Sequence, residues 1–81
     1  MKMCYVYIVS DDLRTKFLTG ITDDCKALDL ASKRKFKHLI YFETFRNLKH
    51  AMKREKELKR WKLGWKLALI KRMNPKLKSL L

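Results

Sequence analysis

The chain has 81 residues, 47% of them hydrophobic, and it carries a formal net charge of +13 at pH 7. This length supports one small domain, and the presence of only two Gly and one Pro argues against long flexible linkers. Its apolar stretches are too short to cross a bilayer, and its N-terminus lacks the apolar run of a secretory signal. We therefore expect a cytoplasmic protein.

The positive charge is concentrated in the second half of the chain. Residues 1–45 hold 8 basic and 6 acidic side chains, whereas residues 46–81 hold 13 basic and 2 acidic ones. A basic surface of this density attracts polyanions, and nucleic acid is the leading candidate. Solubility alone does not require nearly all of the charge to have one sign, so we favour a nucleic-acid partner.

The first part of the chain predicts a β-hairpin. Residues 3–9 are mainly β-branched and aromatic and end in a polar turn, and residues 16–21 supply an antiparallel partner strand. Gly20 inside the second strand predicts a bulge or a close backbone approach. Cys4 in this region and Cys25 form no CxxC pair, and they fit either one disulfide or, as we favour, two buried free thiols.

A helix and a third strand are expected next. Thr22, Asp23 and Asp24 are typical of a helix start, and the helix should end near residue 35, where three cations suit the negative end of its dipole. Residues 38–45 are mostly apolar and predict the third strand. His38 and His50 stand alone in the sequence and fit surface or core-edge positions better than zinc ligands.

The remaining residues predict helix. Asn47 should cap a long helix, and residues 61–72 continue the helical pattern, with Gly64 leaving open whether there is one kinked helix or two. The predicted inward residues of the first part are Leu48, Ala51, Met52 and Leu58, and we expect Trp61 and Trp65 to lie in the core. The order ββαβαα makes residues 1–81 one α+β domain, with a small, mostly antiparallel three-stranded sheet flanked by helices.

Glu55 stands out because helical spacing places it on the apolar side of its helix, four residues after Ala51 and three before Leu58. An unpaired buried carboxylate is costly, so it should be paired, hydrogen-bonded or bound to a metal. One interpretation is a Glu at the edge of the stripe that reaches water or pairs with a Lys on another element. The other is an oxygen ligand for a divalent metal.

Three stretches of the chain resemble the compact single-domain branch of the GIY-YIG endonuclease superfamily. The superfamily also includes the N-terminal nuclease domain of the bacterial DNA-repair excinuclease. Tyr5-Val6-Tyr7 lies where the family has G-I-Y, and Leu18-Thr19-Gly20 lies where it has Y-I-G. The most specific match lies in residues 51–61, where the family branch has the pattern A-x-x-R-E-K-x-L-K-x-W. A second pattern of the branch, W-K-x-x-L-I-x-x-M-N-P, matches residues 65–75. The resemblance covers nearly the whole chain.

The resemblance implies metal-assisted hydrolysis of phosphodiester bonds. Glu55 matches the Glu that binds Mg²⁺ or Mn²⁺, and Tyr7 matches the Tyr of the first motif. Two expected residues are missing, because Leu18 replaces the Tyr of the second motif and Leu28 replaces the Arg that contacts the scissile phosphate. Losing such a cation typically costs on the order of 10²–10³ in rate, so catalysis should be weak or lost.

The sequence is consistent with three functions. The favoured one is binding of nucleic acid, DNA in the first place, with phosphates neutralised by the basic helices and little sequence preference. The residues predicted to do this are Lys49, Lys53, Lys56, Arg60, Lys62 and Lys66. The alternatives are an active metal-dependent DNA endonuclease that uses Tyr7 and Glu55, and a protein-interaction or membrane-surface module.

Overall fold

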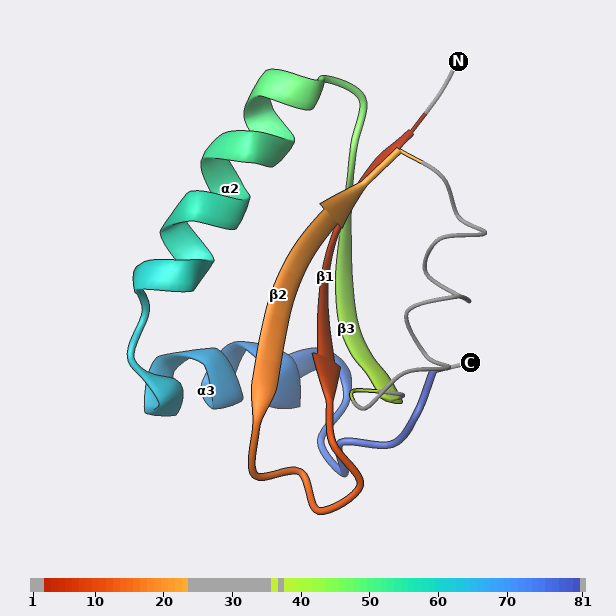
Figure 1. Ribbon diagram of the computed structural model, residues 1–81, viewed down its shortest axis with the longest axis vertical. Helices are drawn as coiled ribbons and strands as arrows, with labels where there is room; N and C mark the ends of the chain where they lie inside the picture. The colour runs from red at the N-terminus through yellow and green to blue at the C-terminus, as the bar shows by residue number, and fades with distance from the viewer. Residues whose placement is uncertain (1–2, 24–35, 37, 81) are drawn as a thin grey trace.

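The computed structural model describes residues 3–23, 36 and 38–80, and it confirms the α+β class (Figure 1). The elements are β1 (Cys4–Ser10), β2 (Phe17–Thr22), β3 (His38–Phe45), α2 (Leu48–Arg60) and α3 (Leu63–Met73). The helix predicted to end near residue 35 lies almost entirely outside the described residues. Within the described part of the chain, no helix is long and apolar enough to cross a membrane.

The sheet has three strands in the order β2-β1-β3, and both pairings are antiparallel, as the sequence predicts. The β1–β2 register places Tyr7 opposite Gly20. The irregularity in the sheet lies between β1 and β3, at Ile8 and Val9, and not at Gly20. What approaches Gly20 closely is a side chain and not backbone, since a Cβ at this position would overlap Cζ and Oη of Tyr7.

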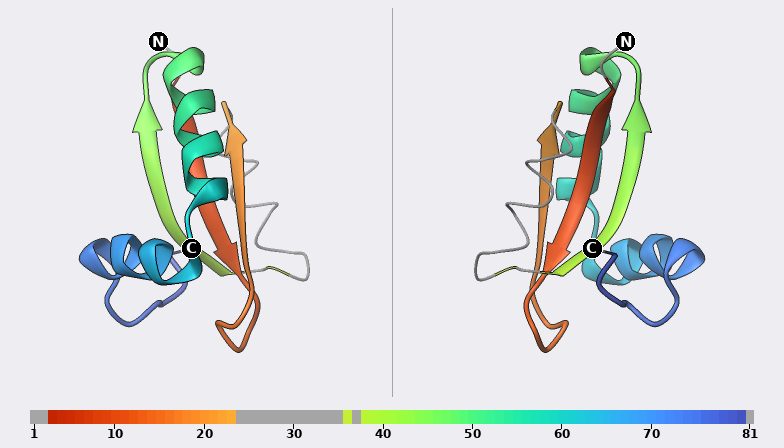
Figure 2. Two further views of the ribbon diagram at one scale, coloured as in Figure 1. Left: turned by 90° about the vertical axis from the view of Figure 1, so that its left-hand side faces the viewer. Right: turned by 90° about the vertical axis from the view of Figure 1, so that its right-hand side faces the viewer.

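The two helices lie on the same side of the sheet, with α2 running along the strands and α3 crossing one end of them (Figures 1 and 2). Successive residues of a strand point to opposite faces. Cys4 and Val6 of β1 therefore meet Ala51 and Leu58 of α2 on one face. On the other face, Val9 and Leu39 form a separate buried cluster. Four aromatic residues pack against it: Tyr5, Tyr7, Phe36 and Phe42.

Helix α2 begins as predicted, because the Asn47 side chain accepts a hydrogen bond of 2.8 Å from the backbone N–H of Lys49. Its buried stripe is narrower than the sequence suggests. Ala51 and Leu58 are fully buried, but Leu48 is 52% exposed and Met52 44% exposed, so the prediction that these two residues face inward was wrong. A sheet of three strands covers only part of a helix surface, and the flanks of the stripe stay in solvent.

The second helix is separate from the first. The backbone leaves the helical conformation at Trp61 and Lys62, so the break lies before Gly64, which sits in the first turn of α3 with open space around it. Because α3 turns across the sheet, Ile70 is buried while Trp65 is 61% exposed. The prediction that Trp65 belongs to the core was therefore wrong, whereas Trp61 packs against the cluster of Val6 and Leu58.

The segment after α3 folds back on the sheet through Asn74. The Asn74 amide is buried and donates hydrogen bonds to the backbone oxygens of Ile40 at 3.0 Å and Lys78 at 2.7 Å. The backbone N–H of Leu80 donates to the oxygen of Leu39 at 2.7 Å, and Leu77 packs against the core. These bonds fix the position of α3 relative to β3.

Candidate functional site

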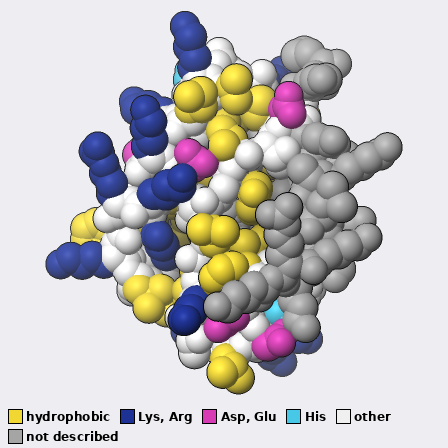
Figure 3. Space-filling view, in the orientation of Figure 1, with side chains coloured by type: hydrophobic (Ala, Val, Ile, Leu, Met, Phe, Trp, Pro, Cys, Tyr) yellow, Lys and Arg dark blue, Asp and Glu magenta, His cyan; other side chains and the backbone are white. Residues whose placement is uncertain are grey.

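A row of cations follows the outer side of α2. Its members are separated by four, three and four residues, a spacing that keeps them on one face along about 16 Å of helix. The members of this α2 row are Lys49, Lys53, Lys56 and Arg60. All of them are exposed, and the space-filling view shows dark-blue Lys and Arg side chains gathered over this helix (Figure 3).

Two further predicted cations continue the basic surface beyond the break between the helices. Lys62 is the N-cap residue of α3 and is exposed, whereas Lys66 is half-buried. Among the described residues, the ion pairs of this region involve Arg54 and Lys59, and none involves the α2 row, Lys62 or Lys66. None of these six cations therefore has an ion-pair partner among the acids of the described part of the chain.

An ion pair between Arg54 and Glu43 joins α2 to β3, in addition to the packing of Ala51 and Leu58. Arg54 donates from Nε to Oε1 of Glu43 at 2.9 Å and from Nη2 to Oε2 at 3.0 Å, and Tyr41 donates its hydroxyl to Oε2 at 2.5 Å. The Arg54 guanidinium also lies 5.1 Å from the centre of the Trp61 ring. A planar guanidinium bound at two points resists rotation of the helix, so this cluster holds the α2 row outward.

The ionisation of this cluster follows from its contacts. Burial alone would raise the pKa of Glu43, but the hydrogen bonds from Arg54 and Tyr41 and the Arg54 charge outweigh it and lower the pKa. The hydrogen bond to Glu43 raises the pKa of Arg54, and burial together with the Glu43 carboxylate raises the pKa of Tyr41. The cluster therefore holds one carboxylate, one guanidinium and one neutral phenol at neutral pH.

Glu55 lies on the inward side of α2, as predicted, with 17% of its side chain exposed. Its carboxylate lies 3.6 Å from Nζ of Lys59, one turn further along the same helix. The partner is thus a Lys of the same helix and not of another element. No group of three His, Cys, Asp or Glu side chains that could hold a metal occurs among residues 3–23, 36 and 38–80. Glu55 offers a single carboxylate, which does not fit a resident metal ion bound by protein ligands alone.

Tyr7 lies on the other face of the sheet. Its neighbour Val6 packs against α2, whereas Tyr7 belongs to the aromatic cluster around Val9 and Leu39 and its ring crosses Gly20. The sheet thus separates the packing environments of Tyr7 and Glu55. Leu18 is 52% exposed on the edge strand β2, and Leu28 lies outside the described residues.

Sequence reasoning did not identify two features of this region. The Tyr41–Glu43–Arg54 cluster depends on the packing of α2 on β3, and its only sequence signal is a single acid within a mostly apolar strand. The second feature is Thr19, which is 6% exposed and whose hydroxyl has no hydrogen-bond partner among the described residues. A buried hydroxyl without a partner is costly, so Thr19 is a weak point of the core.

Comparisons of the chain with protein-family models, with curated proteins and with solved structures found no match. The functional assignment therefore depends on the surface of the molecule. Its most distinctive feature is the α2 row, on a helix that the Arg54–Glu43 pair joins to β3, with no ion-pair partner among the described acids.

Proposed function

We propose that this protein binds nucleic acid, and DNA in the first place, through the outward cations of α2 on a scaffold of the GIY-YIG nuclease type. The observation that supports this proposal is the α2 row, in which four exposed cations follow one helix face over about 16 Å. The basic surface continues through Lys62 and Lys66. An extended line of positive charge is complementary to the regularly spaced phosphates of a nucleic-acid strand.

The binding mechanism is neutralisation of phosphates with release of condensed counterions. Lys side chains act as flexible point charges and carry no fixed geometry for reading bases, so sequence preference should be small. If the α2 row, Lys62 and Lys66 contribute four to six contacts to duplex DNA, log K should fall with log salt concentration with a slope between about −3.6 and about −5.4.

Fluorescence anisotropy with labelled duplexes of unrelated sequence tests this proposal. We expect the duplexes to bind with similar affinity and to give the same steep salt slope. A slope near zero, or binding to one sequence alone, would contradict phosphate neutralisation as the source of affinity. Vesicles of phosphatidylglycerol serve as a comparison, since a membrane-surface protein would bind them in preference to DNA.

We infer metal-dependent cleavage as a second candidate function because of the environment of Glu55. This carboxylate is largely buried on a helix rich in cations, and its one described partner is the ion-pair contact with Lys59 at 3.6 Å. Mg²⁺ commonly binds through one or two carboxylates together with phosphates of the substrate, so Glu55 could bind the ion only with DNA present. The bound ion would supply polarisation of the phosphate.

A nicking assay with Mg²⁺ or Mn²⁺ on duplex and branched DNA separates binding from cleavage. If the second candidate is correct, Glu55→Gln abolishes product formation and leaves DNA affinity unchanged within about twofold. Glu57→Gln is a matched control, because Glu57 is exposed on the same helix. Equal product from wild type and Glu55→Gln would exclude this role of Glu55. If the wild-type protein gives no metal-dependent product, cleavage is excluded and DNA binding remains the proposed function.

A further inference from the structure

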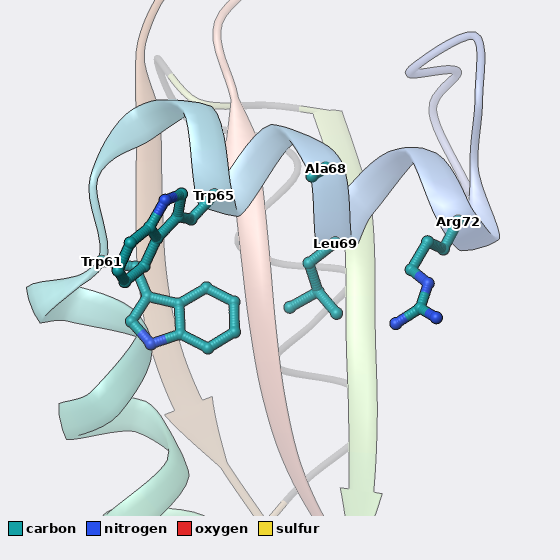
Figure 4. Close-up of a pocket in the computed structure, with 5 residues that line it drawn as sticks. All are labelled: Trp61, Trp65, Ala68, Leu69 and Arg72. Carbon is teal, nitrogen blue, oxygen red and sulfur yellow. The ribbon is translucent and has the colours of Figure 1, made fainter.

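An open apolar pocket lies between the end of α2 and the side of α3. It has a volume of about 410 Å³ and is lined by Trp61, Trp65, Ala68, Leu69 and Arg72 (Figure 4). Trp65, Leu69 and Arg72 follow one another at four- and three-residue spacing, and their side chains project to the same side of α3. The pocket therefore presents aromatic surface at one end and a guanidinium at the other.

The two indole rings make a corner in this pocket. Their centroids lie 6.1 Å apart and their planes meet at 83°. The Arg54 guanidinium lies over the Trp61 ring, whereas Trp65 is 61% exposed. A flat aromatic ligand could thus stack on the free surface of Trp65 and touch Trp61 with its edge, the two arrangements that aromatic rings prefer.

The charges around the pocket select the kind of ligand. No acidic residue follows Glu57 in the sequence, so every charged side chain of α3 and of the segment after it is a cation. The ligand that fits combines a flat apolar ring with negative charge, as a nucleotide does. In a duplex the faces of each base are covered by its neighbours, so only an unpaired base can stack on a side chain.

We propose that Trp65 is a stacking platform for an unpaired nucleobase, with the adjoining phosphate bound by Arg72. This inference rests on the proposed nucleic-acid binding and adds a preference for single-stranded segments. The α2 row supplies affinity for any phosphate backbone, and the pocket distinguishes strands whose bases are accessible.

Fluorescence of a single Trp tests the proposal directly. The chain has two Trp residues, so Trp61→Phe leaves Trp65 as the only indole. We expect an oligothymidylate of about 15 nucleotides, within the usual range of site sizes, to quench its emission. An abasic oligomer of the same length should bind through its phosphates without quenching. Equal quenching by the two oligomers would overturn the proposal.

Affinity measurements on variants provide the second test. Stacking of one base is typically worth a factor of about 5 to 150 in affinity, so Trp65→Ala should weaken oligothymidylate binding by that factor. Trp65→Phe should retain part of it, and duplex affinity should stay within about twofold. Leu63→Ala is the control, because Leu63 is 51% exposed on the same helix and does not line the pocket.

The outcomes separate this inference from the proposed function. If Trp65→Ala leaves oligothymidylate affinity unchanged while the wild type binds duplex DNA, stacking is wrong and the binding function stands. If Trp65→Ala weakens duplex binding equally, Trp65 does not select unpaired bases and the inference fails. If neither form of DNA binds and Trp65 emission shifts to the blue on phosphatidylglycerol vesicles, the pocket is a membrane contact and both proposals fail.

Discussion

Replacement of Arg54 by Met should destabilise the protein markedly, because Arg54 joins α2 to the sheet. The substitution removes both hydrogen bonds to Glu43, at 2.9 and 3.0 Å, and the contact with the Trp61 ring at 5.1 Å. Removing one partner of a fully buried ion pair costs about 3–5 kcal/mol. The side chains of Arg54 and Glu43 retain 24% and 20% exposure, so we expect a smaller loss, about 1.5–3 kcal/mol.

Urea denaturation followed by circular dichroism measures this loss, with an unchanged m-value as the sign that the unfolded state is the same. Arg60→Met is the matched control, because it makes the same chemical change at an exposed position of α2 and should cost less than about 0.5 kcal/mol. Combining Arg54→Met with Glu43→Gln should cost less than the sum of the single changes. Equal stability of the Arg54→Met and Arg60→Met proteins would refute the assigned role of the ion pair.

Three further predictions concern the sheet and its turn. Thr19→Val removes the buried hydroxyl that has no described partner, and it should raise the free energy of unfolding by about 1 kcal/mol in urea denaturation. Gly20→Ala should lower it by about 1–3 kcal/mol, because the new Cβ would overlap the end of the Tyr7 ring, and Tyr7→Leu should relieve most of that loss. The Asp11 carboxylate accepts a hydrogen bond from the backbone N–H of Lys16 and further hydrogen bonds from Thr15, and these lower its pKa to about 2. The stability contributed by this carboxylate is therefore present above pH 3.8 and is lost as the pH falls toward 2. Asp11→Asn should flatten this part of a pH series of unfolding midpoints, and an unchanged acid profile would contradict the role of the turn.

The strands and the helix start were predictable because their signals are local. A run of β-branched and aromatic residues before a polar turn identified β1, and a mostly apolar run identified β3. Asn47 identified the start of α2 through its own side-chain chemistry. The exposure of Leu48, Met52 and Trp65 was not predictable, because it depends on how much of each helix a three-stranded sheet covers and on the change of direction at Trp61.

The candidate site was predicted in part for the same reason. The outward position of the α2 row follows from helical periodicity and holds in the structure. The Arg54–Glu43 pair joins residues 11 positions apart in different elements, and only the packing of α2 on β3 brings them together. The positions of Tyr7 and Glu55 relative to each other likewise depend on which face of the sheet the helix covers, which periodicity within one element cannot give.

The salt dependence of duplex binding in charge-matched variants tests most directly whether the α2 row contacts phosphates. Lys53→Gln combined with Lys56→Gln removes two charges from the row, and Lys16→Gln combined with Lys76→Gln removes two exposed charges elsewhere. We predict that the first pair lowers the magnitude of the slope of log K against log salt concentration by about 2, and that the second pair leaves it unchanged. Equal slopes for the two double variants would contradict binding through α2.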